Sequence, residues 1–277
     1  MQPKIHSVLI TGATGFLGHH LSAYLKEKKR KIYPLNLRKQ WEDQAPEHYD
    51  CIIHLAGKAH DLKSLTSADQ FYKTNVTLTE DAFRHFLNSN AILFIHLSSI
   101  AAIEEEHSEV ELTEDTPPNP RSPYGKSKLE AENALLKTPL PDGKKLIILR
   151  PAMIHGPGDK GNITLLYRLI NKGIPYPFAS FSNKRTFLSI DNFCFVIDKI
   201  LENKIPSGIY NVVDDESLST LEIIGIISQS TGRLIHKVYL PKRMVFVLGK
   251  IGDLLKLPIN SNRIAKLTTD LPVSNKS

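Results

Sequence analysis

A set of evenly spaced glycines directly after a short apolar segment constrains this chain more than any other feature. Residues 8–10 (Val-Leu-Ile) predict a buried strand, and residues 16–29 carry apolar side chains at helical spacing. Gly12, Gly15 and Gly18 lie between them, as G-x-x-G-x-x-G rather than the usual G-x-G-x-x-G. Such glycines allow a tight turn, approach of the backbone to a pyrophosphate, and close packing of helix on strand. The pattern predicts a dinucleotide site, with a purely structural turn as the alternative.

Strand patterns alternate with helix patterns along the first half of the chain. Further strands are expected at 32–37, 51–56, 92–97 and 145–149, and further helices at 68–87 and 122–136. This alternation predicts an α/β fold with a Rossmann-like, doubly wound parallel sheet. After residue 151, prolines and glycines break the chain into short pieces. We therefore expect a dinucleotide-binding domain at 1–155 and a smaller, irregular substrate-binding cap at 156–277, with some of its segments returning to the sheet.

Composition excludes several classes of protein. The 277 residues carry a net charge of +6, and the charges are scattered, so we expect solvated faces and no nucleic-acid partner. No apolar stretch approaches the roughly 20 residues of a membrane span, and residues 1–4 show no secretory leader. The apolar segment 244–257 is interrupted by charges such as Lys250, which predicts an amphipathic core helix. Cys51 and Cys194 fit no metal or redox spacing, which predicts a cytoplasmic protein without a metal site.

The octet TGATGFLG at residues 11–18 resembles the extended short-chain dehydrogenase/reductase superfamily, in particular the NAD-dependent epimerase/dehydratase proteins that act on nucleotide sugars. The resemblance continues in DCIIHLAG at 50–57, PYGKSK at 123–128 and RP at 150–151. It implies an NAD(P)-dependent enzyme, an oxidoreductase or isomerase, whose second ligand is a nucleotide-diphosphate sugar. The cofactor-binding residues that it implies are Gly12, Thr14, Gly15, Phe16, Leu17, Gly18, Asn36, Arg38, Leu55, Ala56, Gly57, Tyr124, Lys128 and Pro151.

The end of the second predicted strand bears on the choice between NAD and NADP. An acidic residue there bonds the ribose 2′-hydroxyl of NAD, whereas a nearby arginine accepts the 2′-phosphate of NADP. Asn36 stands where family epimerases usually have Asp, and Arg38 and Lys39 follow. Because a guanidinium pairs with a phosphate and a carboxylate repels it, we favour NADP. If Arg38 and Lys39 are only solvated loop residues, NAD stays open.

The connection that follows is short. Only residues 40–49 separate the second predicted strand from the third. A crossover unit needs at least about 10–12 residues before an added strand is counted. We therefore expect the third edge strand of the family sheet to be missing.

Tyr124 and Lys128 are four residues apart on a predicted helix and therefore share one face. The pKa of a free tyrosine is about 10, and a neighbouring ammonium and an oxidised nicotinamide should both lower it. Tyr124 would then exchange a proton with a sugar hydroxyl while the nicotinamide exchanges hydride with the same carbon. By resemblance, Ser99 rather than Ser98 is the catalytic serine that holds the reacting oxygen, and Lys128 bonds the nicotinamide ribose. A cap at the strand end is the alternative for both serines.

Residues outside this group complete the expected site. By resemblance, Arg185 grips the substrate diphosphate, which suits a bidentate cation. Asn162 is a second candidate contact to the substrate, with a helix cap as the alternative. His54 is expected to be structural or pocket-lining, and Asn75 is expected to bond the backbone of the neighbouring strand and to help shape the region of Lys128.

Several reactions share this chemistry. Ile100 and Ala101 follow Ser99 where dehydratases of the family carry an acid pair, so dehydration is disfavoured. A C4 epimerase with retained NAD and a 4-ketoreductase that exchanges NADP(H) remain, and the residues after the second strand favour the reductase. Three short segments resemble bacterial surface-polysaccharide 4-epimerases and 4-ketoreductases, at 98–100, 117–120 and 158–162. A non-catalytic dinucleotide sensor is the alternative from another class, although such relatives lose the tyrosine and lysine that this chain keeps.

The resemblance also bears on assembly and length. In many relatives two long helices pair across a dimer axis, here those predicted at 68–87 and 122–136, so we expect a homodimer. Family members continue past the segment that resembles residues 267–277, so we expect the C-terminal part to be shortened.

Overall fold

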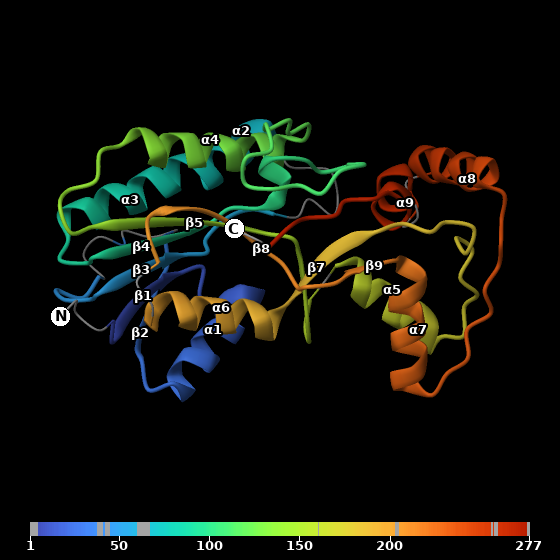
Figure 1. Cartoon of the computed structure of the whole chain (residues 1–277), viewed down its shortest axis with the longest axis horizontal. Coiled ribbons are helices and arrows are strands. Elements are labelled where there is room, and N and C mark those ends of the chain that lie inside the picture. The colour runs from blue at the N-terminus through green and yellow to red at the C-terminus, as the bar shows by residue number, and fades with distance from the viewer. Residues whose placement is uncertain are drawn as a thin grey trace.

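The computed structural model describes residues 5–37, 41, 45–59, 67–159, 161–202, 205–255, 257 and 260–275. Its main body is a parallel sheet of six strands in the order β2-β1-β3-β4-β5-β8 (Figure 1). The strands are β1 (Ser7–Thr11), β2 (Lys31–Leu35), β3 (Cys51–His54), β4 (Leu93–Leu97), β5 (Lys145–Pro151) and β8 (Gly208–Val212). The prediction of a Rossmann-like, doubly wound sheet is confirmed.

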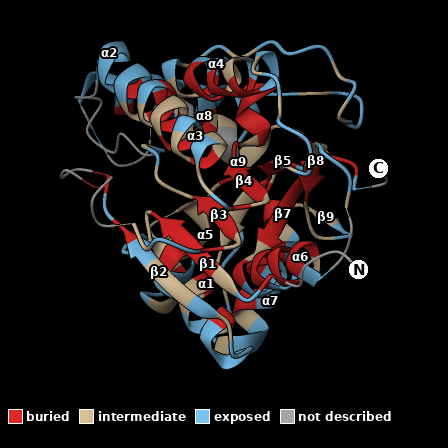
Figure 2. Ribbon diagram, turned by 90° about the vertical axis from the view of Figure 1, so that its left-hand side faces the viewer, coloured by how far each residue is buried: buried red, intermediate tan, exposed pale blue. Residues whose placement is uncertain are grey.

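Helices cover both faces of this sheet (Figure 1). One layer holds α1 (Phe16–Glu27) and α6 (Ile190–Glu202), and the other holds α2 (Ala68–Tyr72), α3 (Leu78–Asn88) and α4 (Pro123–Lys137). Successive side chains of a strand point to opposite faces. In β1, Val8 and Ile10 accordingly pack in the core under α1, and Leu9 packs in the core under α3. Figure 2 shows the buried strands between helices whose outer surfaces are exposed.

The sheet ends at β2 on one side within the described part of the chain. Trp41, which the sequence left without a role, is buried in the core under α3 together with Leu35 and Leu37. Its ring lies 5.1 Å from that of His85 on α3. The short segment after β2 therefore closes the core with an aromatic side chain.

A second, smaller body follows β5 and lies at the right of Figure 1. Its sheet has the order β6-β7-β9, formed by β6 (Met153–His155), β7 (Arg185–Ser189) and β9 (Ser217–Leu218). Its helices are α5 (Asn162–Asn171), α7 (Thr220–Thr231), α8 (Lys242–Leu254) and α9 (Ser261–Thr268). A separate core joins these elements through residues such as Leu166, Phe187, Ile224 and Val245. Because β8 and α6 belong to the main body, the chain crosses between the two bodies more than once.

One sequence interpretation is refined and one needs correction. The long helix predicted at 68–87 is present, and α2 and α3 are joined without a break by a π-helical turn (Lys73–Thr77). The segment 244–257 does form a helix, but it is not a core helix. The apolar side chains Val247, Leu254 and Leu255 on and beside α8 are exposed. The sequence showed the amphipathic period but not which face the rest of the chain would cover.

Candidate active site

The glycine turn after β1 is built by close contacts between backbones. Gly12 has a φ of +70°, which favours glycine, and a Cβ there would lie 2.8 Å from the backbone nitrogen of Ala56. A Cβ on Gly18 would lie 2.5 Å from the Cα of Ala13. The first glycine thus lets the ends of β1 and β3 meet, and the last lets α1 pack against the turn.

The start of α1 fits the pyrophosphate of a dinucleotide. Gly15 is the residue before the helix, and no side chain caps the first N–H groups of α1. Uncapped N–H groups together with the helix dipole attract an anion. Thr14 is exposed beside this end, and Phe16 and Leu17 are half-buried in the first turn.

Asn36 lies close to this turn, because Leu35 pairs with Thr11 in the sheet and Asn36 is the next residue. Its side chain is exposed. No acidic side chain therefore occupies this position at the end of β2. Arg38 and Lys39, on which the preference for NADP also depends, lie outside the described residues.

The end of β3 links the glycine turn to the predicted catalytic helix. Leu55 and Ala56 are half-buried, and Gly57 is exposed. A Cβ on Gly57 would lie 3.2 Å from the Nζ atom of Lys128 and 3.3 Å from the Oδ1 atom of Asn75. The dinucleotide turn and the lysine of α4 are therefore parts of one continuous site.

Asn75 lies in the π-helical turn and holds this region together. Its amide nitrogen donates to the carbonyl of Lys58 at 3.0 Å and to the hydroxyl of Ser127 at 2.9 Å. Its amide oxygen accepts from the backbone N–H of Lys58 at 2.7 Å. Asn75 thus bonds the backbone of the segment that follows β3 rather than the strand itself, and it lies beside Lys128 at Gly57.

Ser99, Tyr124 and Lys128 converge at the carboxyl end of β4. The Tyr124 phenol lies beside the Ser99 hydroxyl, which lowers the pKa of the phenol, and both residues are half-buried. The Lys128 ammonium is buried and donates to the carbonyl of Leu97 at 2.7 Å. Gly125 permits this approach, because a Cβ there would overlap the carbonyl oxygen of Ala101.

The pKa values of Tyr124 and Lys128 are both set mainly by burial. Burial raises the pKa of the Tyr124 phenol, and its hydrogen bond with Ser99 offsets part of that increase. Burial lowers the pKa of Lys128 to about 8, against the attraction of Glu132. For the residues of the chain alone, burial and the negative charge of Glu105 leave the pKa of the phenol raised. The predicted lowering also depends on an oxidised nicotinamide and stays a prediction.

A buried polar network that the sequence analysis missed lies beneath this group. The Ser98 hydroxyl donates to the carboxylate of Glu132, and Arg150 forms an ion pair with that carboxylate at 2.6 Å. Glu132 and Arg150 are 1% and 3% exposed, so the pair is desolvated. Glu132 follows Lys128 by four residues on α4, and this spacing was the signal that could have identified it.

The histidines of the sheet are structural in this arrangement. His54 Nδ1 lies 2.9 Å from the Thr11 hydroxyl, and its Nε2 lies 2.9 Å from the Thr79 hydroxyl. Burial lowers the pKa of His54 to about 3. His96 stacks on His54 at 5.6 Å between ring centroids. Within the described residues, no three His, Cys, Asp or Glu side chains are grouped as metal ligands, and no helix has the length and apolar character to cross a bilayer.

The predicted substrate contacts belong to the smaller body. Arg185 on β7 is buried, and its guanidinium donates to the Thr269 hydroxyl at 3.1 Å. Burial lowers the pKa of Arg185 to about 10, so it is charged at neutral pH. Asn162 is the first residue of α5, and Gly161 rather than Asn162 occupies the capping position. Pro151, a predicted cofactor contact, is buried at the end of β5. The side-chain hydrogen bonds of Arg185 go to Thr269 and not to Tyr124.

Comparison with known proteins agrees with this geometry. Residues 8–212 match the model of the NAD dependent epimerase/dehydratase family. The chain belongs to this family. It is 30% identical over 242 residues to a UDP-glucose 4-epimerase of Vibrio cholerae, across 79% of this chain and 74% of that protein. The family consists of NAD(P)-dependent enzymes that epimerise, dehydrate or reduce nucleotide sugars.

Other relatives differ in their substrates. The chain is 27% identical over 286 residues to an Escherichia coli 4-epimerase of N-acetyl-α-D-glucosaminyl-diphospho-ditrans,octacis-undecaprenol, across 94% of this chain and 85% of that protein. Its fold is similar to that of MoeE5 solved with UDP-glucuronic acid and NAD, with a TM-score of 0.76 at 19% identity over 98% of this chain and 90% of that chain. It is also similar to RMD from Pseudomonas aeruginosa solved with NADPH, with a TM-score of 0.71 at 23% identity over 84% of this chain and 87% of that chain.

Proposed function

We propose that this protein transfers hydride at a sugar carbon, C4, of a nucleotide-diphosphate hexose, as an epimerase or 4-ketoreductase of bacterial-type surface-polysaccharide biosynthesis. The observation that carries the proposal is that the Tyr124 phenol lies beside the Ser99 hydroxyl at the end of β4, with Lys128 on the same helix as Tyr124 and its Nζ atom 2.7 Å from the Leu97 carbonyl. The glycine turn and the uncapped start of α1 provide a matching site for the cofactor pyrophosphate.

Each of these residues has a separate proposed role at the reacting oxygen of the sugar. A bound nicotinamide supplies or accepts the hydride. Ser99 holds the sugar oxygen by a hydrogen bond, and Tyr124 gives a proton to that oxygen or removes one from it. The ammonium of Lys128 holds the nicotinamide ribose and favours the phenolate form of the tyrosine. Arg185 binds the substrate diphosphate, and Asn162 is a second contact on the same side.

The residues after the catalytic serine argue against a dehydratase. Dehydration needs an acid and a base that move a proton at a second carbon. Ile100 and Ala101, which directly follow Ser99, are apolar and buried. The negative charge of Glu105 raises the pKa of Tyr124, but its carboxylate accepts from the backbone N–H of Ser122 at 2.7 Å and so holds the residue whose side chain caps α4.

For the cofactor we propose NADP in preference to NAD. The support is that an exposed amide side chain, Asn36, stands beside the glycine turn where a carboxylate would repel a 2′-phosphate. Asn36→Asp should shift the preference from NADPH to NADH by about tenfold, because the new carboxylate would repel the 2′-phosphate by roughly 1.4 kcal/mol. Dissociation constants for both nucleotides test this. An unchanged ratio would contradict the role of Asn36.

For assembly and location we propose a cytoplasmic homodimer. A groove between the outer surfaces of α3 and α4 is lined by residues such as Val76, Leu129 and Ala134, and two such surfaces are able to pair. Both cysteines are buried free thiols, which suits a reducing compartment. Light scattering on a size-exclusion column would test the dimer.

A lipid-linked sugar diphosphate is a second candidate substrate. The relative named for an undecaprenol-linked sugar matches 94% of this chain, and the small body exposes the apolar helix α8. Nucleotide and polyprenyl sugar diphosphates share the hexose and the diphosphate, so the residues above apply to both.

The decisive experiment is Tyr124→Phe, with Tyr239→Phe as the control because Tyr239 is 67% exposed in the small body. An enzyme should lose its turnover of UDP-, GDP- or dTDP-hexoses by about 100-fold or more and still bind the cofactor. Native mass spectrometry reads the cofactor that the purified protein retains: NAD indicates an epimerase, and selective uptake of NADPH indicates a reductase. Turnover that survives in the variant would refute the proposed role. The protein would be identified as a sensor if the wild type turns over none of these sugars and Tyr124→Phe still binds the cofactor and a protein partner.

A further inference from the structure

Helix α8 presents a large apolar surface that the rest of the described chain does not cover. Its exposed apolar side chains, together with those of the residues directly after it, are Met244, Phe246, Val247, Leu248, Ile251, Leu254, Leu255 and Leu257. Leu254 is 82% exposed and Val247 is 55% exposed. Globular monomers seldom expose a contiguous set of this size without a use for it.

The helix already has a buried side, so this surface is additional to its packing. Val245, Gly249 and Gly252 are buried, and a Cβ on Gly249 would lie 2.9 Å from the Cδ1 atom of Ile264 on α9. With about 100° per residue, Val247 and Leu254 lie on the side of α8 opposite these glycines. Small residues hold α8 against α9, and large apolar residues point away from the protein.

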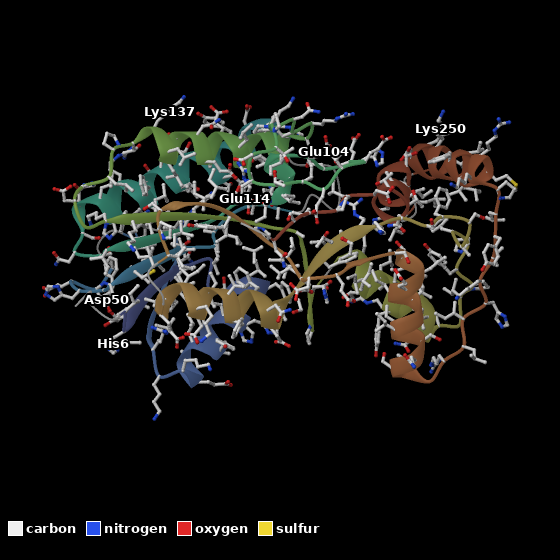
Figure 3. All side chains as sticks on the ribbon, viewed as in Figure 1. His6, Asp50, Glu104, Glu114, Lys137 and Lys250 are labelled. Atoms are coloured by element: carbon white, nitrogen blue, oxygen red, sulfur yellow. The ribbon has the colours of Figure 1, made fainter. Side chains whose placement is uncertain are left out.

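Cations border this apolar side. Arg243 and Lys250 lie on the same helix, and helical spacing puts them together along one edge of the row that holds Val247 and Leu254. In Figure 3, Lys250 extends from α8 away from the body of the protein. Lys242 lies over the ring of Phe181, 5.4 Å from its centroid. With three cations against the single acidic residue Asp253, the net charge of α8 is positive.

We propose that α8 lies in the surface of a membrane that contains anionic lipids, with its apolar side among the acyl chains and its cations at the phosphates. A helix with one apolar face, a cationic border and too little length to span is the kind that binds in the interface. A second copy of this chain is a weaker occupant, because a two-fold contact between α8 helices would bring like charges together. The residues after α9 do not cover α8 either, since Leu271 and Val273 pair beside Arg185 and Leu112.

The position of α8 suits such a contact. Figure 1 shows it at the outer corner of the small body, at the far end from the N-terminal strand of the main sheet. Ser99 and Tyr124 belong to the main body, so the proposed surface does not depend on the proposed reaction.

Co-sedimentation of the full chain with vesicles tests the proposal. We expect binding to vesicles that mix phosphatidylcholine with phosphatidylglycerol and little binding to phosphatidylcholine alone. Replacing two apolar side chains (Val247→Gln with Leu254→Gln) should weaken binding about 30-fold. Removing two charges (Arg243→Gln with Lys250→Gln) should weaken it about fivefold per charge. High salt should remove the contribution of the cations and leave that of the apolar residues.

Ile226→Gln is the matched control, because Ile226 is an apolar residue of α7 that is 55% exposed. It should bind vesicles as the wild type does. Circular dichroism and thermal unfolding of all variants verify that the fold is kept. The proposal is overturned if the wild type stays in the supernatant with both kinds of vesicle, or if Val247→Gln with Leu254→Gln leaves binding unchanged. It is also overturned if that variant converts a dimer to a monomer while no form binds lipid.

Discussion

Removing the negative charge of Glu132 is the sharpest perturbation of this structure. Its carboxylate accepts from Arg150 at 2.6 Å and from the hydroxyl of Ser98. The side chains of Arg150 and Glu132 are 4% and 1% exposed. Glu132→Gln keeps the shape of the side chain but leaves the guanidinium of Arg150 buried without a counter-charge. It also brings an amide N–H group toward the N–H groups of Arg150 and the hydroxyl of Ser98, which are themselves donors.

The expected loss in the free energy of unfolding is large for a single substitution. Breaking a buried ion pair by removing one partner costs about 3–5 kcal/mol. For a chain of this size, about 3 kcal/mol corresponds to a decrease of roughly 6–12 °C in the melting temperature. The same change should lower the pKa of Lys128 below about 8, because the charge of Glu132 favours the ammonium.

Urea and thermal unfolding measure the first effect, and the pH profile of turnover measures the second. Glu130→Gln is the control on the same helix, since Glu130 is exposed, and it should change neither. A double variant, Glu132→Met with Arg150→Met, should recover much of the stability, because an apolar pair can replace a buried ion pair. If Glu132→Gln lowers the free energy of unfolding by less than about 1 kcal/mol, the view that Glu132 and Arg150 form a desolvated ion pair is refuted.

Three further outcomes are expected. Gly18→Ala should abolish cofactor binding and destabilise the fold, because its Cβ would lie 2.5 Å from the Cα of Ala13; fluorescence titration with NADPH would detect retained binding as a contradiction. Stability should fall as the pH drops from 7 to 5, by about 2 kcal/mol, because the pKa of His54 is lowered to about 3 while the unfolded chain takes up its proton near pH 6.5; a flat urea midpoint over this range would show that His54 is not buried in the neutral form. His96→Leu should keep or raise stability by about 1 kcal/mol, because neither ring nitrogen of His96 has a hydrogen-bond partner; a marked loss in urea unfolding would indicate a partner.

The sequence was most informative where local geometry requires particular residues. A tight turn between a strand and a helix needs glycine where the backbone must approach another backbone, so Gly12 and Gly18 could be recognised without a structure. The four-residue spacing of Tyr124 and Lys128 fixed their common face in the same way. These are short-range constraints, and the chain itself carries them.

Contacts between distant segments were decided by the tertiary structure. The approach of Ser99 to Tyr124 and the ion pair of Glu132 with Arg150 join segments that are separate in the sequence. The direction of the Tyr124 pKa was also out of reach, because it depends on how much water packing removes. Side-chain type reveals that a group is able to titrate, and only its surroundings determine the free energy of each charged form.

Helix α8 shows the same division at the surface. The helical spacing of its apolar and charged residues predicted a helix, and the structure has a helix at this place. Which of its sides would be covered could not be read, because burial is set by the neighbours that the fold supplies. Here α9 packs against the side with Gly249, and the larger apolar side chains are left in the open. Periodicity determined the secondary structure, and three-dimensional packing determined which apolar surface remained available for another partner.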